Sequence, residues 1–385
     1  MTSSVLIVGG SIAGTSLAYW LHRHGFAVTV VERAAALRDG GYKVDIRGAA
    51  IDVVSRMGIL DTLRSLRTEV RAGTVVDGSG KRVASMDGDT FGGRTHGDAE
   101  LLRGDLTRVL YDLTGNDVEY RFGEAITALD GNRVGFASGS SASYDLIIGA
   151  DGVHSTTRAL AFGPEERFRH DLGYRIAICS VPNHLGLDRE EVTYVGPGRT
   201  ALVYSTAGSS DAKAMFLYAG AEPSLRDVYA GSGWEVPALL EAAGSAPDLY
   251  ADVMTQVRMD RWSAGPVALV GDAAWCASPA SGQGTSLALV GAYVLAGELA
   301  TGGGFAGYER RMRPFAERNQ KLGPANVKRM VLSTERQVRA SMRMLAVMDH
   351  LPFKDRLLAA AMAPLHKAAN AIDLPEYGAA RSASS

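Results

Sequence analysis

Cysteine is scarce in this chain of 385 residues. Cys179 and Cys276 are the only two, and they lie far apart in the sequence. A disulfide scaffold needs more cysteines, and a thiolate zinc site needs cysteines at close spacing. None of the eight histidines has the paired spacing of metal ligands. We therefore expect no metal centre and a reducing, cytoplasmic location.

An excess of charge of one sign is also lacking. The 40 lysines and arginines nearly balance the 42 aspartates and glutamates, which leaves a net charge of -2. Because nucleic-acid binding needs clustered cations to neutralise phosphates, we expect no nucleic-acid partner. The apolar runs, such as Leu287–Val294, are shorter than the roughly 20 residues that cross a bilayer. We expect no membrane segment, and no signal-peptide pattern precedes the first apolar run.

Glycine, in contrast, is abundant, and its first cluster lies in a predicted βαβ unit. The apolar run Val5–Val8 is typical of a buried parallel strand, and the sequence GGSIAG follows it over residues 9–14. A helix is expected over Thr15–Gly25 and a second strand over Ala27–Val31. Such a unit of about thirty residues is typical of a dinucleotide-binding domain.

Each part of this unit has a physical role. Gly9 permits the tight turn, and Gly14 permits close packing of the helix on the strand. The helix N-terminus offers N–H groups to a pyrophosphate, and Glu32 can accept hydrogen bonds from ribose hydroxyls. Ser11 replaces the middle glycine of the usual motif, a departure that Gly10 can offset. The cofactor-binding candidates in this unit are Gly9, Ser11, Ile12, Ala13, Gly14 and Glu32.

Two later segments repeat the pattern of a strand followed by a tight turn. The first has a strand that ends before Asp151-Gly152, with a helix that starts at Ser155. The second has a buried strand that ends in Gly271-Asp272, followed by the turn sequence SPASGQG and a small-residue helix over Thr285–Leu299. The three segments in this order resemble the class A flavoprotein monooxygenases of the para-hydroxybenzoate hydroxylase type.

The resemblance covers roughly residues 1–320 and implies an α/β fold. A Rossmann-like FAD-binding domain is then interleaved with a mainly antiparallel β-sheet substrate domain, and C-terminal helices brace the two. The expected division is residues 1–70, 98–163 and 263–312 for the FAD-binding domain, 71–97 and 164–262 for the substrate domain, 313–377 for the bracing helices and 378–385 for a tail.

The resemblance also implies how these residues meet FAD. The Asp272 carboxylate contacts the ribityl and pyrophosphate part, while the turn after it brings backbone N–H groups to the isoalloxazine edge. Asp151 is shared between FAD and the pyridine nucleotide, and Arg158 closes its motif. Arg103 approaches the phosphate or ribityl region, although a helix-face salt bridge is its alternative role. The further cofactor-binding candidates are Arg33, Asp45, Arg103, Asp151, Asp272, Pro279, Gly282, Gly284 and Thr285.

The segment GGYKVD at residues 40–45 resembles more narrowly the tetracycline-oxidising branch of this family. In that branch a carboxylate lies near the flavin, and Asp45 matches its position. Its alternative role is that of a turn residue. Two departures stand out, because Trp275 replaces a histidine common after the Gly-Asp motif, and Thr285-Ser286 replaces a common asparagine.

The middle of the chain is expected to hold the substrate. Residues 164–262 contain alternating and β-branched runs separated by glycine-rich turns, which predicts a largely antiparallel sheet. Adjacent strand residues point to opposite faces, so only some of the candidates can line a pocket. Core packing or exposure to solvent is their alternative role. The substrate-binding candidates are Arg175, Tyr204, Met215, Phe216 and Tyr218.

The resemblance implies that NADPH or NADH reduces the FAD and that O2 then forms a flavin C4a-hydroperoxide. This species would hydroxylate a cyclic or polycyclic aromatic or enolic small molecule, such as an antibiotic or polyketide, although insertion of oxygen into a ring stays open. A flavin-dependent reductase or dehydrogenase and a flavin-bound protein that only sequesters a ligand are the alternatives. The flavin supplies the chemistry, so Asp45 is the one candidate for a catalytic side chain. A monomer or homodimer is expected.

Overall fold

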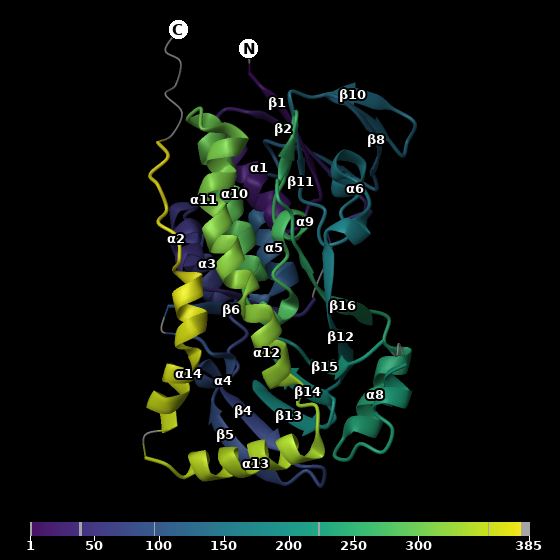
Figure 1. Cartoon of the computed structure of the whole chain (residues 1–385), viewed down its shortest axis with the longest axis vertical. Coiled ribbons are helices and arrows are strands. Elements are labelled where there is room, and N and C mark those ends of the chain that lie inside the picture. The colour runs from purple at the N-terminus through teal and green to yellow at the C-terminus, as the bar shows by residue number, and fades with distance from the viewer. Residues whose placement is uncertain (1, 38–40, 96, 222–223, 353, 379–385) are drawn as a thin grey trace.

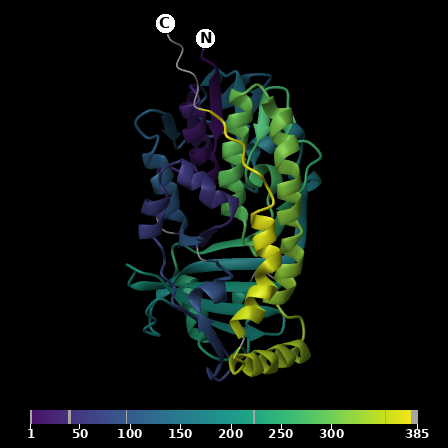
Figure 2. The same cartoon turned by 90° about the vertical axis from the view of Figure 1, so that its left-hand side faces the viewer.

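The computed structural model describes residues 2–37, 41–95, 97–221, 224–352 and 354–378. Two large sheets lie towards opposite ends of an elongated molecule, as the two views in Figures 1 and 2 show. The first sheet has the strand order β17-β18-β11-β1-β2-β7, and its neighbours are parallel except for β17 with β18. Its strands are β1 (Ser4–Val8), β2 (Ala27–Glu32), β7 (Glu119–Phe122), β11 (Leu146–Gly149), β17 (Ser263–Ala264) and β18 (Val267–Leu269).

The first sheet is buried on both faces, as its continuous apolar strands predict. Val5, Ile7 and Val30 point into a large core built with the helices on one side. Leu6 and Val31 point the other way, towards a small sheet of order β10-β9-β8. The covering elements are α1 (Ile12–Arg23), α2 (Ala49–Arg56), α3 (Leu60–Ser65), α5 (Arg103–Asp112), α10 (Gly284–Ala300) and α11 (Gly304–Gln320) on the first side, and α6 (Thr156–Phe162), β8 (Ile126–Asp130), β9 (Arg133–Phe136) and β10 (Ser141–Ser143) on the second.

The second sheet has the strand order β16-β12-β15-β14-β13-β4-β5 and is antiparallel except where β13 pairs with β4. Helix α8 (Val236–Ser245) covers one of its faces, and α12 (Leu322–Met330) packs on the other. Its strands are β4 (Ala72–Val76), β5 (Arg82–Asp87), β12 (Arg169–Pro182), β13 (Glu190–Gly196), β14 (Arg199–Ser205), β15 (Asp211–Ala219) and β16 (Tyr250–Val257).

Short elements connect the two sheets. A two-stranded antiparallel ladder pairs β3 (Lys43–Ile46) with β6 (Ala99–Leu102). These two strands precede and follow β4 and β5 of the second sheet in the chain. The predicted α/β architecture with a mainly antiparallel second sheet is confirmed, while the predicted domain boundaries stay a prediction. The remaining short helices are α4 (Gly88–Gly92), α7 (Leu225–Val228), α9 (Asp272–Trp275), η1 (Glu165–Arg167) and η2 (Pro279–Ser281).

The C-terminal region is divided into more helices than the sequence pattern predicted. The sequence over Pro314–Leu351 has the periodicity of one long helix, with Pro324 expected as a kink or a start. The structure divides it among α11, α12 and α13 (Glu335–Asp349). Pro324 lies in the first turn of α12, where a missing N–H costs little. Thr334 caps α13 through a capping box with Gln337, which fixes a new helix start after the break.

The chain ends in a segment that returns to the FAD-binding domain. After α14 (Lys354–Ala369), this C-terminal segment runs back along α10, as Figure 2 shows in yellow. The Tyr377 hydroxyl donates to Glu298 at 2.7 Å, and the Tyr293 hydroxyl donates to the Pro375 carbonyl at 2.6 Å. Arg56 of α2 forms an ion pair with Glu376 at 2.8 Å. Most of the predicted tail, residues 379–385, lies outside the described residues.

Within the part of the chain that the structure describes, no helix is both long and apolar enough to cross a membrane.

Two glycines in helices provide a matched test of the packing. A Cβ at Gly14 of α1 would lie 1.8 Å from the Gly9 carbonyl oxygen, whereas one at Gly244 of α8 would have 3.7 Å to its nearest atom. Gly14→Ala should therefore lower the free energy of unfolding by about 1–3 kcal/mol through overpacking. Gly244→Ala should raise it by up to about 1 kcal/mol, because alanine favours the helix. Denaturant titration of both variants checks the opposite signs, and equal signs would contradict the packing described.

Candidate functional site

The glycine turn after β1 packs tightly against the end of β11. Gly9 has a φ of 106°, and its N–H donates to the Val31 carbonyl at 2.8 Å. A Cβ at Gly9 would lie 2.5 Å from the carbonyl oxygen of Ala150. Gly9 and Gly14 have no side chains, and there is no room for any at these positions. The two glycines therefore allow α1 to start directly at the edge of the sheet.

The N-terminus of α1 has no side-chain cap. Ser11 is the N-cap residue, but its hydroxyl makes no capping hydrogen bond. Ser11 Oγ instead accepts a hydrogen bond from the Arg103 guanidinium at 2.9 Å. The N–H groups of the first turn, which includes Ile12 and Ala13, receive nothing from Ser11, and the helix dipole favours an anion beside them. A guanidinium next to an open helix N-terminus suits a pyrophosphate.

Glu32 lies at the end of β2, facing the glycine turn. One of its carboxylate oxygens accepts from the Gly10 N–H at 2.8 Å, and the other accepts from the Ala34 N–H at 2.9 Å. The side chain is half-buried, whereas neighbouring Arg33 is exposed. These contacts fix the Glu32 carboxylate next to α1, at the place where the βαβ pattern expects a ribose.

Arg103 and Asp272 come together from segments far apart in the sequence. The Arg103 guanidinium lies 5.8 Å from the centre of the Tyr42 ring, and its backbone N–H donates to the Tyr42 carbonyl at 3.0 Å. Asp272 is solvent-exposed at the start of α9. Part of its side chain reaches solvent, but protein surrounds the carboxylate closely enough to remove much of its hydration. This desolvation raises the pKa of Asp272, while the charge of Arg103 opposes that shift. Arg103 thus links the N-terminus of α1 through Ser11 to the second strand-turn motif.

The turn before α10 presents its backbone rather than side chains. Pro279, Gly282 and Gly284 are exposed, and a Cβ at either glycine would have no atom within 4 Å. Gly282 has a φ of 63°, in the region that favours glycine. Gln283 between them is fully buried, and both of its side-chain polar atoms lack a hydrogen-bond partner among the described residues. Sequence reasoning passed over Gln283, because a lone polar residue in a turn gives no signal of burial.

The Asp151 carboxylate is engaged with its own helix. It accepts from the Ser155 hydroxyl at 2.5 Å and from the Thr157 N–H at 2.8 Å, so it holds the start of α6. Arg158 is fully buried and donates to the carbonyls of Ala273 at 3.0 Å and Val153 at 2.6 Å. Arg158 therefore joins the two later motifs physically, a role that its place at the end of the motif did not reveal.

Trp275, the departure from the usual histidine, belongs to the core. It is 2% exposed and packs with Trp262 and Tyr308, at centroid distances of 5.6 and 6.4 Å. A Cβ at Gly291 of α10 would lie 2.6 Å from its ring. Trp275 therefore packs against α10 and has no open side towards a ligand.

Asp45 lies on β3 between two arginines. Its carboxylate forms an ion pair with Arg47 at 2.8 Å and lies 3.7 Å from Arg94. Gly40, at the start of the predicted motif, lies outside the described residues, whereas Gly41 is exposed beside Arg103. The structure thus gives Asp45 a place in an ion network rather than in a simple turn.

This network is a buried charge cluster that sequence analysis missed. Lys43 contacts Glu191 at 2.5 Å and Glu100 at 3.3 Å, and Arg94 contacts Glu100 at 2.5 Å. Burial alone would raise the pKa of Glu100, but Lys43 and Arg94 outweigh it and lower that pKa. The members come from β3, β6, β13 and the loop after α4, so no local spacing could have identified them.

The five substrate-binding candidates divide between the two faces of the second sheet. Tyr204 points towards β3, where its hydroxyl accepts from the Lys43 N–H at 3.2 Å. Its side chain is fully buried, which corrects the expectation that it lines a pocket. Met215 packs near Ala280, next to the exposed turn. Phe216 and Tyr218 lie on the opposite face, buried in the core under α8 with Tyr229.

Arg175 pairs with Tyr218 in the sheet and alternates with inward-facing Ile176, so it shares the α8 face. The placement corrects the expectation for Arg175, Phe216 and Tyr218. The α8 side of the sheet is closed by its own core, and these three residues do not face the predicted FAD site.

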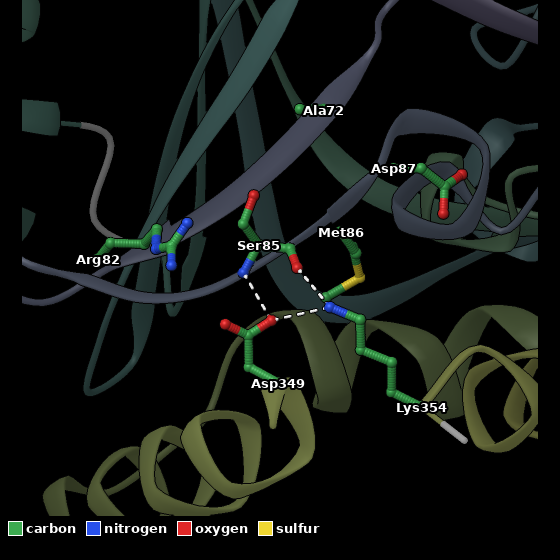
Figure 3. A pocket seen from close by; sticks show the side chains of 7 residues that line it. All are labelled: Ala72, Arg82, Ser85, Met86, Asp87, Asp349 and Lys354. Atoms are coloured by element: carbon green, nitrogen blue, oxygen red, sulfur yellow. Dashed lines mark hydrogen bonds and ion pairs between the residues drawn. The ribbon is translucent and has the colours of Figure 1, made fainter. Parts of the chain in front are cut away.

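A surface hollow of about 430 Å³ lies elsewhere, between β5 and the helices α13 and α14. Figure 3 shows Asp349 and Lys354 at its lower rim, where both contact the backbone of Ser85. Its walls are mostly polar and charged side chains, with Ala72 and Met86 as the apolar members. Among the described residues, no group of three histidine, cysteine, aspartate or glutamate side chains could hold a metal ion.

Comparison with known proteins fits this geometry. The sequence profile described as an FAD binding domain matches residues 2–169 and 250–318. The chain belongs to the family of FAD-dependent monooxygenases. An uncharacterized protein of Mycobacterium tuberculosis (strain ATCC 25618 / H37Rv) is 44% identical over 347 residues, which is 84% of this chain and 93% of that protein. A flavin-dependent monooxygenase of an unknown prokaryotic organism is 39% identical over 342 residues, with 84% and 89% of the two chains covered.

The likeness extends to a solved structure of the same kind of enzyme. The tetracycline destructase Tet(51) matches this monooxygenase with a TM-score of 0.82 and 34% identity, over 98% of this chain and 100% of that chain. The predicted resemblance to the class A flavin monooxygenases, with its enzyme class, is therefore confirmed. The residues present fit FAD, since an uncapped helix N-terminus, an exposed carboxylate at Asp272 and an exposed backbone turn lie around Arg103.

Asp272 provides a test in which stability and cofactor binding change in opposite directions. The pKa of Asp272 is higher in the folded than in the unfolded protein. Above this raised pKa the ionised carboxylate therefore lowers the free energy of unfolding. Below the unfolded pKa of about 4 the carboxyl is protonated in both states, and this destabilisation disappears. Apoprotein carrying Asp272→Asn should therefore unfold at a higher temperature than wild type at pH 8, with the difference shrinking towards pH 4. The same variant should bind FAD roughly tenfold or more weakly, because it loses a charged acceptor.

Circular dichroism melting of both apoproteins and quenching of flavin fluorescence on titration check these two effects. Asp260→Asn, at an exposed carboxylate after β16, is the matched control and should change neither. An apoprotein that is less stable than wild type at pH 8 would contradict the electrostatic environment described for Asp272.

Proposed function

We propose that this monooxygenase uses FAD, NADPH or NADH, and O2 to add one oxygen atom to a polycyclic aromatic or enolic small molecule. The observation that carries the proposal is the meeting of Ser11, Arg103 and Asp272 beside an uncapped helix N-terminus, next to a backbone-lined turn. The likeness to a tetracycline destructase over almost the whole chain supports a polycyclic substrate such as an antibiotic or polyketide.

When bound, FAD would supply the redox chemistry by accepting a hydride and reacting with O2. The protein's own residues bind and orient it. The N–H groups at the start of α1 and the Arg103 guanidinium would hold the pyrophosphate, and Glu32 would accept hydrogen bonds from the adenosine ribose. Asp272 would accept from the ribityl hydroxyls.

The exposed turn at Gly282–Gly284 would place backbone N–H groups along the carbonyl edge of the flavin ring. Oriented N–H dipoles stabilise negative charge without any proton transfer, which suits a ring that gains electrons. Pro279 keeps this turn rigid, while Gly282 and Gly284 place no side chain between the ring and the substrate. Asp45 would contribute a carboxylate on the side of β3.

The substrate would lie between this turn and the second sheet. Met215 is the candidate on this face whose side chain is only partly buried, and it offers an adaptable apolar surface. Tyr204 lies on the same face but is fully buried, so it supports the wall from beneath. Such a surface orients a planar ring and excludes water, and the sheet itself is rigid. We further propose a monomer or homodimer in the cytoplasm, consistent with two cysteines that are both free and buried.

Oxygen transfer can be tested with the purified, FAD-loaded enzyme and a panel of polycyclic phenols that includes tetracycline. We expect a compound that stimulates NADPH or NADH oxidation and gains one oxygen atom, labelled when the gas is 18O2, as mass spectrometry would show. Turnover without O2 would instead indicate a reductase or dehydrogenase. A compound that binds without any consumption of NADPH or NADH would indicate a sequestering protein.

The two adjacent residues Met215 and Phe216 test which face meets the substrate. Met215→Ala should raise the KM for the active compound at least severalfold while leaving the affinity for FAD unchanged, because it removes apolar contact area. Phe216→Leu, the matched control on the α8 face, should lower the unfolding temperature without changing KM. Steady-state kinetics and thermal melting check both, and a KM effect at Phe216 alone would reverse the assignment of faces.

A further inference from the structure

Arg47 stands out in the charge cluster because it is the most buried of its cations. Its side chain is 3% exposed, whereas the partner carboxylate of Asp45 is 21% exposed. The guanidinium of Arg47 lies 2.8 Å from that carboxylate. The buried Arg47 guanidinium therefore holds the partly exposed Asp45 carboxylate in place from the protein side.

Arg47 also fixes two other elements. Its guanidinium donates to the carbonyl of Gly93 and, at 2.7 Å, to that of Gly92, at the end of α4. Its backbone N–H donates to the hydroxyl of Ser286 at 3.0 Å, in the first turn of α10. One residue thus ties β3, the α4 turn and the start of α10 together.

The contact with Ser286 connects Asp45 to the exposed turn. Ser286 Oγ is 3.5 Å from the carbonyl oxygen of Asp45 and follows Gly284-Thr285 directly. Ser286 is one of the two residues that replace the asparagine common in relatives. Asp45 and the turn that would meet the flavin are therefore held to the same hydroxyl group.

The second arginine of the cluster cannot replace Arg47. Arg94 is bound to Glu100 at 2.5 Å and to Asp89 at 3.0 Å, and its distance to Asp45 is 3.7 Å. Asp45 Oδ1 is buried, has no hydrogen-bond partner among the described residues and faces Arg94, while Arg47 makes the shorter contact to Oδ2 of the same carboxylate.

From these contacts we propose that Arg47 is a positioning residue for the flavin site. It orients the Asp45 carboxylate and fixes it relative to the turn before α10. The inference rests on the proposed place of Asp45 beside FAD. A lysine would not reproduce this role, because its ammonium is a single point charge on a flexible stem. The guanidinium pairs with the carboxylate and donates to two carbonyls from nitrogens held in a fixed fork.

A double-mutant cycle on FAD affinity tests the proposal. The proteins are wild type, Arg47→Gln, Asp45→Asn and the double variant, each freed of FAD and titrated with FAD while flavin fluorescence is followed. Asp45→Asn should weaken FAD binding roughly tenfold, the loss expected for a hydrogen bond to a charged group. Arg47→Gln should weaken it to a similar extent. The double variant should be no weaker than either single variant, because both substitutions remove the same interaction.

Two further measurements separate positioning from simple loss of structure. The visible absorption bands of bound flavin should shift in the same way in Arg47→Gln and Asp45→Asn, and Arg47→Lys should not restore the wild-type bands. Arg94→Gln, which breaks the same buried cluster at Glu100, is the matched control. It should lower the unfolding temperature yet change FAD affinity less than Arg47→Gln does.

The outcomes are distinct. Effects that multiply in the double variant would overturn the inference, because Asp45 and Arg47 would then act independently. Asp45→Asn with wild-type affinity and spectrum would overturn the place of Asp45 beside FAD, and the inference with it. Wild-type protein that binds no FAD would instead defeat the proposed function. If Arg47→Gln does not fold, Asp45→Asn is compared with the double variant alone: equal FAD affinity supports the inference, and weaker binding by the double variant overturns it. The double variant removes both charges of this pair, while Asp98, 4.0 Å from Arg47, loses that neighbour.

Discussion

The approach of α1 to the ends of β1 and β11 is the contact on which the site depends. Helix and strands meet backbone against backbone at Gly9 and Gly14, so the first turn of the helix is brought to the edge of the sheet without a side chain in between. An uncapped helix N-terminus is stable only when something else satisfies its N–H groups. Arg103, bound to the N-cap hydroxyl, reinforces the preference for an anion at this point.

The rest of the architecture brings distant segments to that edge. Arg158 is buried between the second and third motifs and holds them together through carbonyl oxygens rather than through an acid. Next to the second sheet, the charged side chains of the cluster around Lys43 and Glu100 are buried together with their partners. An isolated charge buried there would be strongly unfavourable. Such a cluster contributes little net stability compared with apolar packing, but it defines one geometry between β3 and the second sheet.

The motifs along the first sheet could be predicted because they are local. A short apolar strand, a glycine turn and a helix follow each other within one segment, and the acidic residue Glu32 lies at a fixed distance from them. The faces of the second sheet could not be predicted. Alternation shows that Met215 and Phe216 point apart, but which of them is enclosed by α8 depends on a helix far away in the sequence.

The buried charge cluster escaped prediction, whereas the C-terminal helices were predicted without the positions at which they divide. Lys43, Glu100 and Glu191 come from three strands, and each alone is typical of a solvated surface. The helical periodicity after Pro314 continues through the break at residues 331–334, so only the capping box at Thr334 marks a new start. Contacts between remote residues decided the charge cluster, whereas a local cap decided where α13 begins.

The return of the C-terminal segment to α10 has a consequence for the order in which the protein can be made. Its Tyr377 ring fills the space above Gly297, where a Cβ would lie 2.1 Å from it, and its hydroxyl meets Glu298. The nucleotide-binding half is thus closed by the first and nearly the last described residues of the chain. While the polypeptide is still on the ribosome that half is incomplete, so its final packing must wait until translation has passed residue 377.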